Sequence, residues 1–278
     1  MIKKVLVPTD FSACARAAEE VGLQIAKKAN AEIHFLHLLL TPVEWAKLPV
    51  EKEKLYPETK TKIGIAKSEL GKLRNKAEKL GLKAQEVLKF DLDREEIYRH
   101  IKDHQCDFIV MGSHGTKGLK EILGSNTQRV VRYSTASVMV VKKKLEPFRV
   151  KNIVFAANFK IDVHPAFLKV VEFANLMQAK IHLLYVNLPF SFRETDEVEA
   201  DMQAFKKKCP DVKCSVNIYN ALSEERGIHK FAEAIHADIL ALTTQGKTGF
   251  MKMISPSITE SLVNHSDFPV LSVNIRDK

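Results

Sequence analysis

The chain contains the same pattern twice, and this duplication limits the folds that it can adopt. The residues Lys-Lys-Val-Leu-Val at 3–7 return as Lys-Asn-Ile-Val-Phe at 151–155, and Ala-Glu-Ile-His-Phe-Leu at 31–36 returns as Ala-Lys-Ile-His-Leu-Leu at 179–184. Both repeats are offset by 148 residues. Each copy alternates short apolar runs with segments of helical spacing, which is typical of parallel sheets covered by helices. The duplication therefore predicts two α/β units in one chain.

These two units are expected at residues 1–147 and 148–278. A length of 278 residues suits two domains of about 100–200 residues each. The connection at 145–150 is very short, so the units must lie in contact. In the second copy, Ala-Asp-Ile-Leu at 237–240 corresponds to Cys-Asp-Phe-Ile at 106–109 with an offset of only 131 residues, because the second copy lacks part of the intervening segment.

Apolar runs and helical spacing predict the elements of the first unit. Strands are expected at 4–8, 33–40, 84–90, 107–110 and 137–141. Helices are expected after a cap at Asp10 or Ser12, through 66–80 up to Gly81, at 94–104 and at 128–133. Residues 41–62 hold three prolines and the only Trp, so they predict a long excursion, of the kind that can act as a lid.

A glycine-rich segment follows the strand predicted at 107–110. Gly112 and Gly115 come directly after it, and Gly124-Ser125 then begins a helix. Ligands of open α/β sheets bind at the carboxyl ends of the strands, and backbone N–H groups near glycine can approach an anion closely. A helix start adds further N–H donors and the positive end of the helix dipole. This segment therefore predicts a phosphate site.

The glycine segment, together with Val-Pro-Thr-Asp at 7–10, resembles the universal stress protein family. The resemblance covers nearly the whole chain when it is taken as two copies. It implies two tandem Rossmann-like α/β domains, each with a parallel five-stranded sheet flanked by helices. In this family the last strands of two domains pair across a dimer axis. The runs at 138–141 and 270–273 are therefore expected to pair as an intrachain pseudo-dimer.

The same resemblance implies that the first domain binds ATP, with Mg²⁺ accompanying the nucleotide. The residues implied are Pro8, Thr9, Asp10, Leu38, Met111, Gly112, Gly115, Gly124, Ser125 and Asn126. Asp10 and Leu38 would lie near the base and ribose, and the residues from Gly112 to Asn126 around the phosphates. For Asp10, helix capping is an equally good interpretation of the residue type. The family places nine residues between its second and third glycines, whereas this chain has eight, from Thr116 to Leu123.

The second copy has lost part of this chemistry. Asn158 stands where the first copy has Asp10, and Thr243 stands where it has Gly112. Pro256 takes the place of the glycine before Ser257 and removes an N–H donor. Residues 148–278 are therefore predicted to carry a degenerate nucleotide loop.

Histidines and cysteines are the candidate metal ligands in this sequence. His34 and His37 lie on a mostly apolar strand, where a histidine is usually a core or edge residue. His100 and His104 are one helical turn apart with Cys106 nearby, a spacing that could suggest a metal, although the sequence favours the frayed end of a polar helix there. Cys209 and Cys214 flank Pro210, and their spacing fits no common zinc pattern, so no metal is expected.

Catalytic motifs are equally weak. Residues 241–248 resemble a Walker loop only in part, because Ala241 replaces the leading glycine. His114 has no nucleophile with a fixed third partner beside it. The sequence predicts no catalytic residue and at most slow ATP hydrolysis. A third class, an adenylyl-transferring or ligase-like enzyme, would need signature loops that the sequence lacks.

The distribution of charged and apolar residues limits the partners and the cellular location that are expected for this chain. Residues 1–147 carry 27 Lys and Arg against 19 Asp and Glu, but these charges are scattered with little aromatic interleaving, so no nucleic acid is expected. No apolar run approaches the about 20 residues of a membrane span, and the cytoplasm is the expected location. The chain is predicted to be a stress-response protein, either a homodimer or a monomer. The alternative is a scaffold that binds no nucleotide, or a protein that binds another small ligand, which the eight-residue spacing favours.

Overall fold

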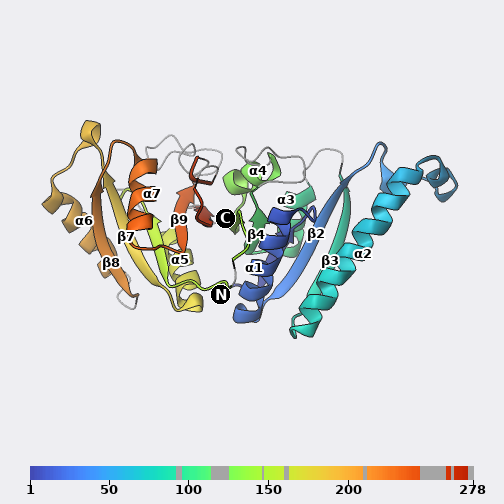
Figure 1. Ribbon diagram of the computed structural model, residues 1–278, viewed down its shortest axis with the longest axis horizontal. Helices are drawn as coiled ribbons and strands as arrows, with labels where there is room; N and C mark the ends of the chain where they lie inside the picture. Colours follow the sequence, from blue (N-terminus) through green and yellow to red (C-terminus); the bar gives the residue numbers. More distant parts are fainter. Residues whose placement is uncertain are drawn as a thin grey trace.

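The computed structural model describes residues 1–91, 96–113, 125–145, 147–159, 163–208, 212–244, 261–263 and 266–274, with only the backbone at Asp91, Ser125 and Asn126. Within them, ten strands form one sheet in the order β3-β2-β1-β4-β5-β10-β9-β6-β7-β8. Figure 1 shows the first half of the chain on the right, the second half on the left and helices on both faces of the sheet.

The first half alternates strands and helices as predicted. Its elements are β1 (Lys4–Pro8), α1 (Ala13–Ala29), β2 (Glu32–Leu40), the 3₁₀ turns η1 (Trp45–Lys47) and η2 (Val50–Leu55), α2 (Pro57–Lys79), β3 (Ala84–Asp91), α3 (Glu96–His104), β4 (Phe108–Gly112), α4 (Ser125–Tyr133) and β5 (Ser137–Val141).

The second half repeats this alternation. Its elements are β6 (Asn152–Ala156), α5 (His164–Met177), β7 (Lys180–Asn187), η3 (Pro189–Ser191), α6 (Thr195–Lys207), β8 (Cys214–Asn220), α7 (Glu224–Ala234), β9 (Ile239–Thr244) and β10 (Val270–Asn274). None of the helices in the described ranges is long and apolar enough to span a bilayer.

Strands pair in parallel within each half, and the two halves join through an antiparallel pair. In that pair Val270 lies opposite Val140 and Leu271 opposite Met139. Both strands are buried along their length, because each lies inside the ten-stranded sheet. The predicted fold of two α/β units arranged as an intrachain pseudo-dimer is confirmed, and the two predicted sheets form one continuous sheet.

The sheet separates two apolar layers. Residues of α1, α2, α5 and α6 pack on one face, where Phe108 and Phe173 stack across the two halves with ring centroids 5.6 Å apart. Residues of α3, α4 and α7 pack on the other face. Small side chains let α1 approach the sheet closely. A Cβ on Gly22, for example, would lie 2.6 Å from Cγ2 of Val7.

Two local predictions are wrong. The excursion after β2 ends earlier than expected, because α2 begins at Pro57, a residue whose fixed φ suits the first turn of a helix. The predicted frayed polar end of α3 is instead packed against the sheet. His100 is 2% exposed, and its ring stacks on that of His104 with centroids 4.1 Å apart.

Candidate functional site

The carboxyl ends of β1 and β4 meet at a switch in strand order. From β1 the chain adds β2 and β3 on one side of the sheet, and β4 and β5 on the other. Ligands of open α/β sheets bind at such switch points, beyond the carboxyl ends of the strands. The structure therefore brings the predicted residues Pro8 to Asp10 and Met111 to Gly112 to one edge of the sheet.

The turn after β1 is held by its own side chains. The Phe11 backbone N–H donates to Oγ1 of Thr9 over 2.9 Å, and that of Ser12 donates to Oδ1 of Asp10 over 3.1 Å. Phe11 has a φ of +61°, a left-handed conformation that few non-glycine residues adopt. These contacts fix the position of the half-buried Asp10 at the sheet edge.

Ser12 rather than Asp10 caps α1. Its side-chain oxygen accepts a hydrogen bond from the Ala15 backbone N–H over 3.2 Å, as expected of an N-cap residue. Of the two capping candidates in the sequence, Ser12 is therefore the cap. The carboxylate of Asp10 orders the turn that precedes the helix.

Buried or half-buried polar side chains of α1 and β2 hold this turn through hydrogen bonds to Thr9. Thr9 donates its hydroxyl to Glu19 of α1, and Nδ1 of His37 donates to the backbone oxygen of Thr9 over 2.8 Å. The ring of His37 stacks on that of Phe11 with centroids 4.7 Å apart. Burial raises the pKa of the Glu19 carboxyl. Burial also lowers the pKa of His37, and the hydrogen bond from His37 to the Thr9 backbone opposes this lowering.

Glu19 is not among the site residues predicted from the sequence, although its spacing in α1 carries a signal. Glu19 lies four residues after Ala15 and three before Gly22, both of which pack on the sheet, so helical spacing places it on the buried side of α1. A carboxylate on a buried helix face needs a partner, because an unpaired buried charge is costly. Thr9 is that partner.

Gly112 lies against α1. A Cβ added to Gly112 would come within 2.8 Å of the backbone carbon of Cys14 and 3.0 Å of the Ala15 backbone nitrogen. Helix packing therefore already accounts for a glycine here. Thr127 is not among the predicted site residues. Its hydroxyl donates to the Gly112 backbone oxygen over 2.9 Å and connects α4 to the end of β4.

Met111 and Leu38 point to the same face of the sheet. Met111 is buried in the apolar layer beneath α3 and α4, so its side chain is committed to the core. Leu38 is half-buried at the margin of that layer. Of these two predicted residues, Leu38 has the more accessible side chain.

Other predicted positions lie at or beyond the limits of the described chain. Gly115 and Gly124 fall outside the described residues. Ser125 and Asn126 are the first two residues of α4, and only their backbone is described. The start of α4 thus has the local structure that the sequence predicts.

The second half has a cavity of about 340 Å³ at the matching edge of its sheet. Asn158 and Val186, the counterparts of Asp10 and Leu38, contribute to its lining, together with Arg193 and Glu224. Nη2 of Arg193 donates to Oδ2 of Asp201 over 2.7 Å, and burial raises the pKa of Glu224. The half with the weaker nucleotide motif therefore has a cavity large enough for a small ligand.

The model of the family described as "Universal stress protein family" matches residues 1–142 and 218–274, more than half of the chain. The chain belongs to this family. Its membership agrees with the glycine segment and with the Val-Pro-Thr-Asp run at the end of β1.

Individual universal stress proteins resemble this chain over about half of its length or nearly all of it. Universal stress protein MJ0577 of Methanocaldococcus jannaschii is 33% identical over 159 residues, which covers 52% of this chain and 97% of that protein. YxiE of Bacillus subtilis is 30% identical over 150 residues, covering 51% of this chain and 100% of YxiE. A crystal structure from Archaeoglobus fulgidus has a TM-score of 0.75 and 21% identity, and covers 99% of this chain and 100% of its own. At 21% identity, this similarity shows that the two chains share a fold.

Proposed function

We propose that this universal stress protein binds ATP, accompanied by Mg²⁺, in its first half. The observation that carries the proposal is the arrangement at the switch point between β1 and β4. Asp10 follows β1 there, and the bond from Thr127 to Gly112 holds the start of α4 beside the end of β4. A helix start offers N–H donors and a positive dipole end to a phosphate.

The roles within this site follow from position and chemistry. Asp10 and the accessible side chain of Leu38 would contact the ribose and base, while the glycine segment and the first turn of α4 would surround the phosphates. Glu19 and His37 are positioning residues, because they hold the Thr9 turn from which Asp10 projects. The proposal assigns no catalytic residue, so nucleotide turnover is expected to be slow at most.

The remaining assignments belong to the same proposal. The domains divide at residues 147 and 148, the protein is cytoplasmic, and it binds no nucleic acid. Pairing of β5 with β10 covers, within one chain, the strand edge that a single domain would expose. We therefore favour a monomer over a homodimer.

Native mass spectrometry of the freshly purified protein tests this proposal. We expect a population carrying the mass of one adenine nucleotide. Gly115→Val should abolish that population and weaken ATP binding in calorimetry, because a branched Cβ obstructs the phosphate and disfavours a positive φ. The control is Gly246→Val at the corresponding position of the second copy. Unchanged ATP affinity in a folded Gly115→Val variant would exclude this segment as the site.

A second candidate function is the binding of another small polar ligand in the second half. The cavity there favours it, because it is lined by Glu224 and by Arg193, whose buried Nη1 has no hydrogen-bond partner among the described residues. Such a ligand would carry an acceptor for the guanidinium. Native mass spectra should then show an adduct that differs from a nucleotide and disappears in Arg193→Leu.

A further inference from the structure

Two histidines and a cysteine converge in the first half, away from the proposed nucleotide site. His34 lies near the start of β2, His100 lies in α3, and Cys106 precedes β4. One nitrogen or sulfur atom from each lies within 4.8 Å of the others, and the three residues are 0%, 2% and 5% exposed. The group is at the amino-terminal edge of the sheet, opposite the edge that carries Asp10 and Gly112.

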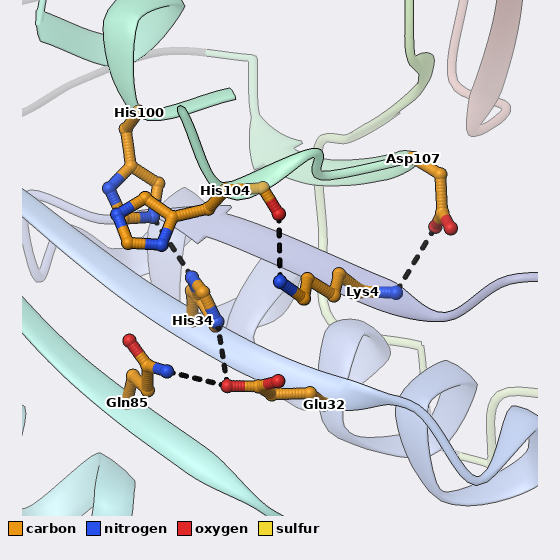
Figure 2. Close-up of polar contacts among 7 residues, drawn as sticks. All are labelled: Lys4, Glu32, His34, Gln85, His100, His104 and Asp107. Atoms are coloured by element: carbon orange, nitrogen blue, oxygen red, sulfur yellow. Dashed lines mark hydrogen bonds and ion pairs between the residues drawn. The ribbon is translucent and has the colours of Figure 1, made fainter. Parts of the chain in front are cut away.

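The hydrogen bonds orient the imidazoles toward this group. Nε2 of His34 lies 3.0 Å from Oε1 of Glu32, and because a carboxylate only accepts, Nε2 carries the proton. Nδ1 of a neutral His34 is then a lone pair, and it lies 3.0 Å from Nε2 of His100. Figure 2 shows this chain from Glu32 through His34 to the stacked rings of His100 and His104.

His100 has an unsatisfied nitrogen. If its Nε2 donates to His34, its Nδ1 is a lone pair, and this buried Nδ1 has no hydrogen-bond partner among the residues that the structure describes. A ring nitrogen with a free lone pair is the form in which imidazole binds metals. A buried polar atom without a partner is uncommon in proteins, because desolvation is not offset by a hydrogen bond.

Groups behind His34 match the surroundings of a metal-bound histidine. Such a histidine usually donates its second N–H to a carboxylate that is itself held by a hydrogen bond. Glu32 supplies that carboxylate, and Nε2 of Gln85 donates to it over 2.6 Å. Figure 2 also shows Lys4, whose ammonium group donates to the backbone oxygen of His104 over 2.9 Å at the end of α3.

The second half provides an internal comparison, because it has the same fold without this group. His182 is the counterpart of His34, whereas Phe231 and Ala237 replace His100 and Cys106. His182 is satisfied there by Ser215 at 2.9 Å and Asn152 at 3.1 Å, and both replacement residues are buried. Packing at this position is therefore achieved with apolar side chains, so the fold itself does not require His100 and Cys106.

We propose that His34, His100 and Cys106 form a binding site for a divalent metal ion that favours tetrahedral nitrogen and sulfur ligands, with Zn²⁺ as the best match. Zn²⁺ binds imidazole nitrogen and thiolate sulfur at about 2.0–2.3 Å, which places its ligands roughly 3.5 Å apart. The three ligand atoms lie within 4.8 Å of one another, so the longest separation would shorten to about 3.5 Å as the ion binds.

Binding would change the protonation of the site. The Cys106 thiol loses its proton to solvent as the sulfur–zinc bond forms, since only the thiolate is a ligand. The proton between Nδ1 of His34 and Nε2 of His100 moves to Nδ1 of His100, so that the two facing nitrogens can both bind the ion. The fourth position of the tetrahedron falls to water or to His104, whose ring centroid lies 5.3 Å from that of His34. The ion would cross-link β2, α3 and the start of β4, three segments that are distant in sequence.

Metal titration of the full-length protein, after removal of bound metal with a chelator, tests this proposal. We expect one equivalent of Zn²⁺ to bind and to raise the melting temperature. Co²⁺ at the same site should give visible ligand-field bands and a near-ultraviolet cysteine-to-cobalt charge-transfer band. Cys106→Ser should remove the charge-transfer band and weaken Zn²⁺ binding at least about tenfold, as expected for loss of a direct ligand.

Matched variants separate a metal site from a structural histidine cluster. The double variant His100→Phe with Cys106→Ala copies the second half, so it should fold and lose Zn²⁺ binding. His182→Gln and Cys14→Ser are the controls and should bind one Zn²⁺ as before. The proposal is overturned if the wild type gives no charge-transfer band, if Cys106→Ser retains it, or if the folded double variant binds Zn²⁺ with unchanged affinity.

Discussion

At the end of β4, the backbone of α1 occupies the space that a side chain on Gly112 would need. The sequence predicted that the glycine here lets a phosphate come close. The structure shows that the backbone of Cys14 and Ala15 also lies close to Gly112. Residue type and spacing indicate that space is required here. They do not identify what fills it, because that depends on how a helix almost a hundred residues away in the chain is packed.

We predict that Gly112→Ala destabilises the protein by about 1–3 kcal/mol, because the added Cβ would overlap backbone atoms that cannot rotate away. Urea denaturation measures the change. Gly64→Ala is the matched control: no atom lies within 4 Å of a Cβ at Gly64 in α2, so it should stabilise the protein by about 0.5–1 kcal/mol. Equal stability of Gly112→Ala and the wild type would contradict the observed packing.

A second prediction concerns Glu19 and pH. Its pKa is raised by burial, so the folded protein binds this proton more tightly than the unfolded chain does. The free energy of unfolding therefore falls as pH rises from the usual carboxyl range through the raised value. Glu19→Gln keeps an oxygen acceptor for Thr9 without the charge. Relative to the wild type, this variant should gain stability as the pH rises above the usual carboxyl range of about 4. A stability difference that does not change with pH would contradict the prediction.

At the scale of elements, the local sequence pattern predicted most strands and helices. It did not predict where α2 begins or which side chains of separate elements meet. The β5 and β10 runs could be identified because they are short, apolar and duplicated. The start of α2 at Pro57 was missed, since prolines and charges also mark loops. The cluster of His34, His100 and Cys106 was not predicted, because its members come together only when β2, α3 and β4 assemble.

The seam between β5 and β10 leads to a third prediction. Residues 1–147 expressed alone would expose β5, a wholly buried apolar strand in the full chain, as a sheet edge. Unpaired apolar edges associate with other strands. Multi-angle light scattering should show this fragment to be a dimer, whereas the full chain, in which β10 covers β5, should be a monomer. A folded, monomeric fragment would show that the edge is protected in another way.

At the scale of the whole molecule, the duplication has produced two related sheet edges that carry different residues. The first-half edge has Asp10 and Gly112, whereas the second-half edge has Asn158, Thr243 and the cavity. The sequence predicted this division of residues, but it could not predict the cavity, because the cavity also depends on Arg193 and on the segment that follows β7. The proposed assignment of the nucleotide site to the first half is therefore tested by measuring the stoichiometry of binding.

We predict that ATP saturates the full chain at one equivalent, in the first half. Binding at a helix start is the sum of several modest contributions from N–H donors and the dipole, so losing a few of them leaves little affinity. In the second half Asn158 lacks a carboxylate, Thr243 adds a Cβ, and Pro256 lacks an N–H. Isothermal titration calorimetry gives the stoichiometry. Asp10→Asn should weaken binding by about tenfold, the effect of about 1.4 kcal/mol, as expected for a lost charged hydrogen bond.

The same titration on Asn158→Ala is the control for the second half, and this variant should bind ATP as the wild type does. Two equivalents of ATP in the wild type would mean that the cavity beside Asn158 also accepts the nucleotide. One equivalent that is lost in Asn158→Ala and kept in Asp10→Asn would place the working site in the second half. In that case the shape of the cavity would outweigh the carboxylate and the glycine that the first half retains.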